Sequence, residues 1–145
     1  NFSLAVNVLV WLARETARKL GNDFDAELFE LHHAAKRDAP SGTALRLAEA
    51  VAEGREQDLD ENLLLERAGD IGARRDRTIA VQTLRGGDNP GEHTVMFVGR
   101  GERIELVHRS ATREHFAEGA VRAAKWLVGK EAGLYPVEAI FGLKD

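Results

Sequence analysis

The chain has 145 residues, of which 43% are hydrophobic and 30% charged, and its formal net charge is −4. These proportions are typical of one globular domain with a hydrophobic core, and the charge favours neither a nucleic-acid partner nor a membrane surface. The absence of cysteine excludes disulfides, iron–sulfur clusters and thiolate zinc sites. A reducing compartment fits this composition, and we expect the protein to be cytoplasmic.

The first twenty residues predict a helix. Apolar side chains recur at helical spacing up to Leu20, with Ser3 placed to cap the start and Gly21 the end, so we expect a helix over residues 3–20. Residues 4–12 are largely apolar but shorter than the ~18 residues that span a bilayer. No basic residues precede them, so we expect no signal peptide. The missing initiator methionine suggests a piece of a longer protein.

A strand and a second helix follow. The alternating pattern over residues 26–33 predicts a strand that ends in His32 and His33. Pro40 keeps the residues before it extended. Helical spacing resumes two residues later and predicts a helix over residues 42–53. The two histidines therefore stand at a strand end, a short loop away from a helix start.

The next part of the chain predicts an antiparallel meander. Residues 55–77 are charged and mixed, with one short strand at 63–65. Three longer strands are predicted over residues 78–85, 92–99 and 102–109, joined by glycine-rich turns. We expect consecutive strands of this set to be neighbours in the sheet.

The predicted fold class is α+β. We expect a mixed, largely antiparallel sheet of four or slightly more strands, with helices packed on one face. Bulky residues point to both faces over residues 95–98, so the sheet needs two covers, and the second is expected to be a partner subunit. A last long helix is predicted over residues 113–130, followed by a short helical turn at 136–142.

The histidines do not form a metal-binding motif. In an extended chain His32 and His33 point to opposite faces, which makes them poor joint ligands for one ion. The other three, His93, His108 and His115, are scattered, and no H-x-x-x-H or H-E-x-x-H spacing occurs. We therefore predict no metal site. The alternative for His32 and His33 is a structural strand-end pair, one side buried and the other in solvent.

A helix start near His32 predicts an anion pocket. The first turn after Ser41 has free backbone N–H groups and the positive end of the helix dipole. Gly42 allows close approach to the backbone, Thr43 adds a hydroxyl and Lys36 adds positive charge. A histidine beside a bound carboxylate can act as general acid, and so can a lysine. The alternative is an ordinary serine-capped helix with no ligand.

Other conspicuous residues receive structural interpretations. The glycine-rich run 86–91 links strand to strand, whereas a dinucleotide loop must open a helix. Glu92 and His93 stand at a strand start and are interpreted as part of a cross-strand polar pair. Arg113 and Phe116 open the last helix, where we expect Phe116 in the core.

The run from Glu30 to Thr43 resembles the signature of the dihydrodipicolinate reductase family, enzymes of the diaminopimelate route to lysine. Residues 1–7, 85–95 and 116–135 also contain stretches similar to this family, so the resemblance spans essentially the whole chain. It implies hydride transfer from NADPH or NADH to the ring of a cyclic dicarboxylate, with a proton supplied by the enzyme.

The resemblance also implies roles for particular residues. Two would be catalytic: His32 as general acid/base and Lys36 as proton donor. Three would contact the carboxylates of the substrate: His33, Gly42 and Thr43. Four would lie near the nicotinamide: Asn1, Phe2, Arg113 and Phe116.

The family pattern is incomplete in this sequence, because the glycine fingerprint of a nucleotide-binding Rossmann domain is absent. Residues 1–145 would then form the substrate-binding and tetramerisation domain of a homotetramer. Two alternatives remain: a non-catalytic assembly or binding module that kept the fold, and a related dehydrogenase acting on another carboxylated imine or enamine.

Overall fold

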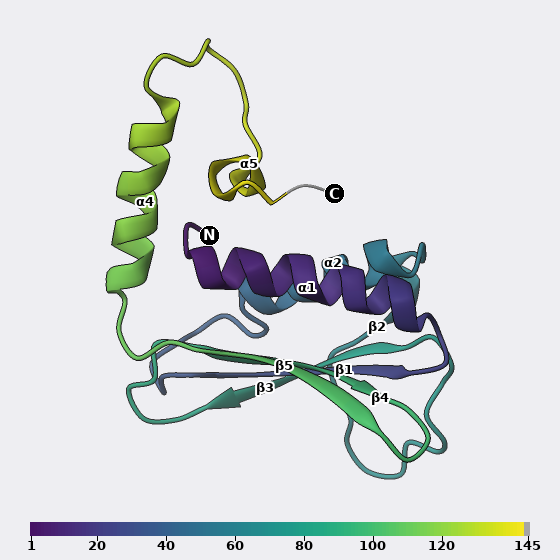
Figure 1. Cartoon of the computed structure of the whole chain (residues 1–145). Coiled ribbons are helices and arrows are strands. Elements are labelled where there is room, and N and C mark those ends of the chain that lie inside the picture. Colours follow the sequence, from purple (N-terminus) through teal and green to yellow (C-terminus); the bar gives the residue numbers. More distant parts are fainter. Residues whose placement is uncertain (144–145) are drawn as a thin grey trace.

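The computed structural model describes residues 1–143, which form one mixed sheet with two long helices over one face (Figure 1). The helices are α1 (Leu4–Leu20), α2 (Gly42–Gly54), α3 (Leu59–Asn62), α4 (Glu114–Leu127) and α5 (Val137–Phe141). The strands are β1 (Asp25–His32), β2 (Leu63–Leu64), β3 (Ile79–Arg85), β4 (Glu92–Val98) and β5 (Arg103–Arg109). The predicted helices and strands are therefore present, with ends shifted by up to three residues.

The five strands lie in the order β2-β3-β1-β4-β5. Strand β1 pairs in parallel with β3 and antiparallel with β4, β2 pairs in parallel with β3, and β4 and β5 form an antiparallel hairpin. The sheet is mixed, as predicted, but the expectation of a continuous meander is wrong because β1 lies between β3 and β4. The glycine-rich connection passes around the end of β1, where the backbone N–H of His33 donates to the carbonyl of Asn89 at 2.8 Å.

Helices α1 and α2 lie side by side over one face of the sheet (Figure 1). Small residues allow this close contact: a Cβ atom on Gly54 would lie only 2.3 Å from the carbonyl oxygen of Arg14. The core fills the space between these helices and the sheet. Its largest fully buried apolar side chains are Leu47, Val51, Ile79, Val81, Val95 and Phe97.

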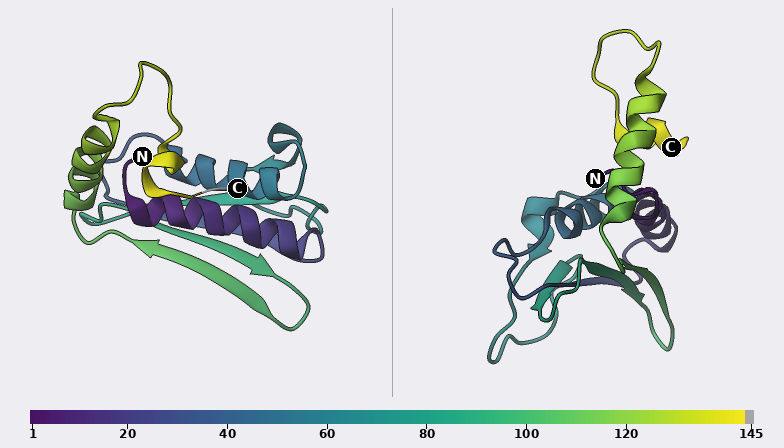
Figure 2. Two further views of the ribbon diagram at one scale, coloured as in Figure 1. Left: turned by 45° about the horizontal axis from the view of Figure 1, so that its top comes forward. Right: turned by 90° about the vertical axis from the view of Figure 1, so that its left-hand side faces the viewer.

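Helix α4 projects away from this body, as Figure 2 shows from two further directions. Within it only Gly119 and Ala123 are buried. Leu127, placed on the predicted apolar face, is 47% exposed, and Phe116 is half-buried against the ring of His115 rather than in the core. The prediction that Phe116 belongs to the core is therefore wrong, because its helix leaves the sheet.

No described helix packs on the face of the sheet opposite α1 and α2, where Arg67 and Arg74 of the loop before β3 pair with Glu27 and cover only part of the surface. Leu84, Val98 and Val107 point to it and are 50%, 36% and 41% exposed. The prediction that both faces carry apolar side chains is confirmed. This face is referred to below as the open face.

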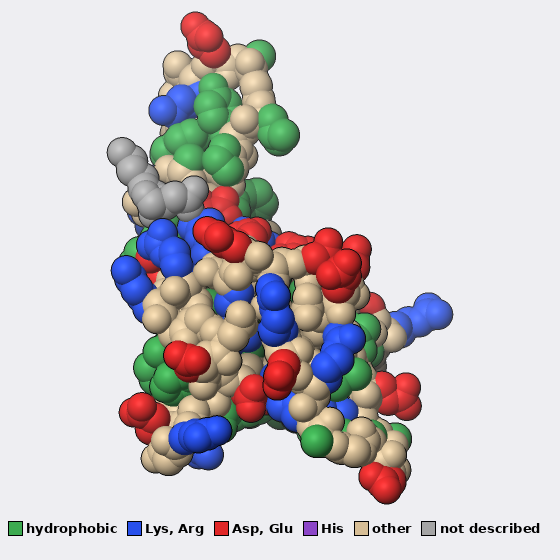
Figure 3. Space-filling model, turned by 90° about the vertical axis from the view of Figure 1, so that its right-hand side faces the viewer, with side chains coloured by type: hydrophobic (Ala, Val, Ile, Leu, Met, Phe, Trp, Pro, Cys, Tyr) green, Lys and Arg blue, Asp and Glu red, His purple; other side chains and the backbone are tan. Residues whose placement is uncertain are grey.

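The surface charges reflect the similar numbers of acidic and basic residues in the sequence. Acidic and basic side chains are interspersed over the end of the molecule that Figure 3 displays. Among the described helices, none is both long and apolar enough to cross a membrane.

Candidate active site

The candidate site begins where the buried face of β1 changes from apolar to charged. Ala26 and Leu28 are core residues, and Glu30 and His32 follow on the same face at 0% and 8% exposure. Strand pairing sets polar partners beside them. Glu30 lies opposite His93 of β4, and His32 lies opposite Arg85 of β3. Residues distant in sequence thus meet at one end of the sheet.

The carboxylate of Glu30 is held by several donors. Its Oε1 accepts hydrogen bonds from the backbone N–H of Ser41 at 2.9 Å, from Arg85 at 3.0 Å and from the hydroxyl of Thr83 at 3.3 Å. Burial by itself raises the pKa of Glu30, but the bonds from Ser41 and Arg85 hold that pKa below its usual value. Glu30 therefore stays a carboxylate at neutral pH.

His32 lies against this carboxylate. Its Nδ1 is 3.1 Å from Oε2 of Glu30, and its ring meets the ring of His93 edge to face with 5.1 Å between centroids. Burial lowers the pKa of His32; Glu30 opposes the change, whereas Lys36 and Arg85 add to it. A neutral imidazole held beside a carboxylate can take up and release a proton near physiological pH.

Gly91 provides the space for this imidazole. It has a φ of +152°, and a Cβ atom there would lie 2.8 Å from Nε2 of His32. Any side chain at this position would displace the ring and strain the backbone. The glycine that precedes Glu92 and His93 in the sequence thus has a geometric role.

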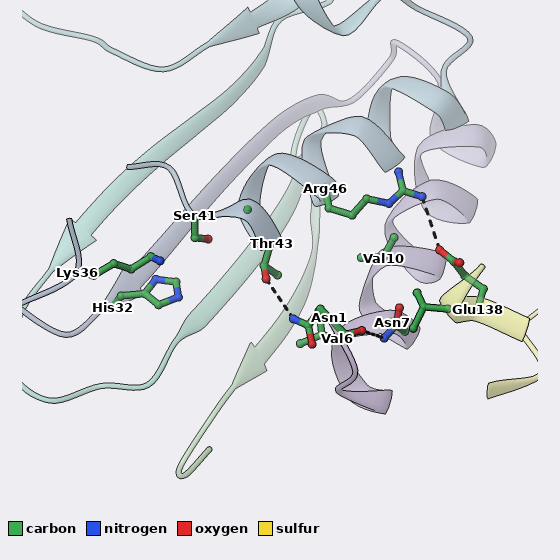
Figure 4. Close-up of a pocket in the computed structure, with 12 residues that line it drawn as sticks. Asn1, Val6, Asn7, Val10, His32, Lys36, Ser41, Thr43, Arg46 and Glu138 are labelled. Atoms are coloured by element: carbon green, nitrogen blue, oxygen red, sulfur yellow. Dashed lines mark hydrogen bonds and ion pairs between the residues drawn. The ribbon is translucent and has the colours of Figure 1, made fainter. Parts of the chain in front are cut away.

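One cavity of about 410 Å³ collects residues from four parts of the chain (Figure 4). Its lining residues are Asn1, Val6, Asn7, Val10, His32, Lys36, Ser41, Gly42, Thr43, Arg46, Val137 and Glu138. Lys36 and His32 lie together at one end, Thr43 near the middle, and Arg46 with Glu138 at the other end. A small ligand in this space would meet an imidazole, an ammonium group and a helix start at once.

The start of α2 forms the middle of the cavity wall. Ser41 caps the helix, since its hydroxyl accepts a hydrogen bond from the N–H of Ala44 at 3.2 Å. The side-chain amide of Asn1 donates to the hydroxyl of Thr43 at 3.2 Å. Beside His32, Lys36 pairs with the exposed Asp38 at 2.8 Å, and this hydrogen bond lowers the pKa of the Asp38 carboxyl. The helix dipole and the ammonium group suit an anionic ligand.

The structure brings together most of the residues singled out in the sequence. Five of them line the cavity: His32, Lys36, Gly42, Thr43 and Asn1. Four do not line it: His33, Phe2, Arg113 and Phe116. Of these, His33 lies just outside the strand end, and Phe2 lies against Gly119 of α4, where a Cβ would clash with the carbonyl of Phe2. Arg113 and Phe116 stand at the start of that helix.

Several residues of the site were not found by sequence reasoning. Glu30 carried a usable signal, because a charged residue stood on the apolar face of a predicted strand. His93 was interpreted as a structural polar residue, and it does form a cross-strand pair, but with Glu30 of β1. Arg46 and Glu138 approach to 3.9 Å across α2 and α5, and no local pattern pointed to that contact.

The fold and the cavity together define an α+β domain equipped to hold a small anionic ligand beside an imidazole and an ammonium group. A family model described as "Dihydrodipicolinate reductase, C-terminus" matches residues 5–141. The chain belongs to this family.

Similar proteins agree with the assignment. A 4-hydroxy-tetrahydrodipicolinate reductase of Desulfotalea psychrophila is 53% identical over 145 residues, which is all of this chain and 54% of that protein. A reductase of the same name from Myxococcus xanthus is 54% identical over 146 residues, 99% of this chain and 53% of that protein. The chain thus spans about half the length of the curated relatives it matches.

A solved structure supports the fold. Dipicolinate-bound dihydrodipicolinate reductase from Paenisporosarcina sp. TG-14 superposes with a TM-score of 0.72 and 24% identity, covering 97% of this chain and 52% of that one. At this identity the likeness establishes the shared fold.

Proposed function

We propose that this chain is the substrate-binding and assembly domain of an NAD(P)H-dependent 4-hydroxy-tetrahydrodipicolinate reductase in the diaminopimelate route to lysine. In the proposed reaction the reduced nicotinamide supplies a hydride to the ring of a cyclic dicarboxylate, and the protein supplies a proton. The proposal rests on family membership and on the names of relatives about 50% identical over this whole chain.

One structural observation carries the proposal furthest. The cavity brings His32 and Lys36 to the same end and sets Gly42 and Thr43 beside them. These are the groups that proton transfer to a bound carboxylate substrate needs, namely a titratable imidazole, a cation and an anion-binding helix start. A cavity of about 410 Å³ is of the size that takes a small molecule.

Within this proposal the residues divide into two groups. His32 or Lys36 delivers the proton, and Glu30 keeps the ring of His32 in place from 3.1 Å. Gly42 and Thr43 bind one carboxylate through the first turn of α2, with His33 contacting the substrate from the loop.

The cofactor, NADPH or NADH, is proposed to bind mainly outside these residues. The sequence has no G-x-G-x-x-G run to open a helix under a pyrophosphate. Such a segment would belong to the part of the relatives that this chain does not cover. Asn1, Phe2, Arg113 and Phe116 are proposed to edge the nicotinamide, since Phe2 lies against the helix that carries Phe116.

The same proposal includes a homotetramer in the cytoplasm. The open face of the sheet supports assembly, because half-exposed Leu84 and Val107 would be buried by a second copy of the domain.

The experiment is a calorimetric titration of the chain with pyridine-2,6-dicarboxylate, a planar mimic of the product. We expect saturable binding by the wild type. We expect binding by Thr43→Val to be about ten- to a hundredfold weaker, since a hydrogen bond to a charged group contributes about 1.5–3 kcal/mol. Lys36→Ala should weaken binding further by removing the nearby cation.

Lys19→Ala is the matched control, because it removes the same charge from the exposed far end of α1. It should bind like the wild type. If a folded wild type and the protein with its nucleotide domain both fail to bind the dicarboxylate, the chain is a non-catalytic module with the same fold.

A further inference from the structure

Three potential metal ligands meet in the buried region beside the cavity, and His32 is the one that lines it. The pairing of β1 with β4 sets Glu30 opposite His93, and His32 follows two residues later on the same face of β1. The exposed fractions are 0% for Glu30, 5% for His93 and 8% for His32. Their ligand atoms all lie within 4.8 Å of one another.

The spacing around Glu30 fits one ion. Its Oε2 lies 3.1 Å from Nδ1 of His32 and 3.7 Å from Nε2 of His93. Two ligands bonded to one tetrahedral ion at about 2.0–2.1 Å stand about 3.3 Å apart. The two measured distances bracket this value, and all three ligand atoms lie within 4.8 Å of one another. To bind an ion, the imidazoles would have to move closer together, and Nε2 of His93 would exchange its 3.2 Å contact with Oγ of Ser41 for the metal.

Unsatisfied polar atoms converge at the same point. Among the described residues, no hydrogen bond reaches Oε2 of Glu30 or Nδ1 of His32, although both atoms are buried. The two are close but not aligned for a hydrogen bond with each other. Buried polar atoms almost always have a hydrogen-bond partner or a bound ion. Here the two atoms would be satisfied by a proton placed between them, by a water molecule or by a cation.

The hydrogen bonds around Glu30 orient its carboxylate in the way that is typical of a metal ligand. Oε1 of Glu30 takes all three hydrogen bonds, from Ser41, Thr83 and Arg85, and Oε2 is left facing the imidazoles. Hydrogen bonds to the non-coordinating oxygen are the common way in which proteins orient a ligating carboxylate. His32 also lines the cavity, which gives an ion a route to the other two ligands.

We propose that Glu30, His32 and His93 form a binding site for a divalent transition metal ion, with Zn²⁺ as the best match. Two imidazole nitrogens and one carboxylate oxygen suit Zn²⁺ and Co²⁺, whereas Mg²⁺ and Ca²⁺ prefer oxygen ligands throughout. A water molecule or a carboxylate from the cavity would occupy the fourth position.

The ion would act as an inhibitor of the proposed reaction, and this consequence rests on the proposed function. A metal ion on Nδ1 of His32 replaces the proton that this ring would exchange. Binding of the ion itself does not depend on that function and can be measured without turnover.

The test uses untagged protein stripped with a chelator and titrated with Zn²⁺ in competition with a chromogenic chelator. We expect one Zn²⁺ per chain. His93→Gln and Glu30→Gln should each weaken binding at least tenfold. His115→Gln is the control, because it removes an imidazole outside the three ligands and should leave the affinity unchanged.

A second measurement covers the case in which a variant does not fold. Co²⁺ added to the wild type should give the intense visible absorption of a four-coordinate ion and should be displaced by Zn²⁺. No Zn²⁺ bound by folded wild type at tens of micromolar, only weak octahedral Co²⁺ absorption, or equal weakening in His115→Gln would each overturn the proposal. Zn²⁺ binding with no dicarboxylate binding, either by this chain or by the protein with its nucleotide domain, would retain the metal site and reject the reductase.

Discussion

The helix-facing side of β1 and β4 has two halves that behave differently. In one half Ala26 lies opposite Phe97 and Leu28 opposite Val95, and all four are buried apolar side chains. In the other half Glu30 lies opposite His93. The apolar half gains stability from any well-packed neighbour, whereas each polar atom in the second half needs a particular partner. The candidate site is thus a continuation of the core in which partners are specified atom by atom.

The largest expected effect is at the polar half. His32→Gln removes the titratable imidazole, and in the protein that includes the nucleotide domain turnover should fall about 10²- to 10⁴-fold, the usual contribution of a general acid or base. Thermal unfolding should change little, because glutamine fills similar space. Steady-state kinetics and calorimetric melting measure the two effects. Turnover within threefold of the wild type would remove His32 from the proposed mechanism.

Leu28→Ala makes the opposite change four residues earlier on the same face of β1. It leaves a cavity in the apolar half, so the free energy of unfolding should fall by about 2–5 kcal/mol. Turnover per folded molecule should be close to that of the wild type, since no atom of the site is touched. Denaturant unfolding and active-site titration test this. A large loss of turnover at unchanged stability would mean that the halves are not separable.

Glu30→Gln sharpens the comparison because it keeps the shape of the side chain and removes its charge. The free energy of unfolding should fall by about 1–3 kcal/mol as the bonds from Ser41 and Arg85 weaken. Glu30 raises the pKa of His32, so in this variant that pKa should fall further, and the loss of kcat/KM caused by deprotonation of a proton-donating His32 should begin at lower pH. Glu118→Gln, exposed on α4, is the control; equal shifts in both variants would contradict the assigned role.

The smallest effect is a pH dependence of stability. Burial lowers the pKa of His93 to about 4 from 6.5, with His32, His108 and Lys36 adding to the shift and Glu30 opposing it. Between these values the unfolded chain binds a proton that the folded chain does not. Stability should therefore fall as pH falls from 6.5 towards 4, by at most about 1.4 kcal/mol per pH unit from this group.

His93→Gln should make that slope shallower over the same interval, and denaturant unfolding in the presence of EDTA measures it. Glu30 contributes only at lower pH, since its pKa is already below 4.5. Identical slopes for the two proteins would show that His93 is not held neutral by burial.

Local sequence patterns were sufficient to predict features that depend on a single helix, strand or turn. The helix over residues 42–53, its cap at Ser41 and the positions of the long strands followed from spacing and turn chemistry, and the structure has them within a few residues. The cluster of His32, Lys36, Gly42 and Thr43 was also predictable, because these residues lie within twelve positions of one another. A strand end, a short loop and a helix start suffice to bring them together.

Strand order was not predictable in the same way. The pattern of residues 78–109 indicates three strands but does not say whether β1 pairs between two of them. That choice depends on which strand most needs burial on both faces and on a glycine-rich connection long enough to pass around β1. For the same reason α4 has a helical pattern, yet its sequence does not indicate that it leaves the sheet.

The sequence by itself determined the helices and strands, the family resemblance and the imidazole, ammonium and helix start of the cavity, because each depends on residues that are neighbours along the chain. Only the tertiary structure decided that His93 and Arg85 join Glu30 and His32 at one end of the sheet. The physical reason is that strand register joins residues 53 or more positions apart through backbone hydrogen bonds. These bonds are the same for every side chain, so the partners of a buried carboxylate become visible only after the sheet has formed.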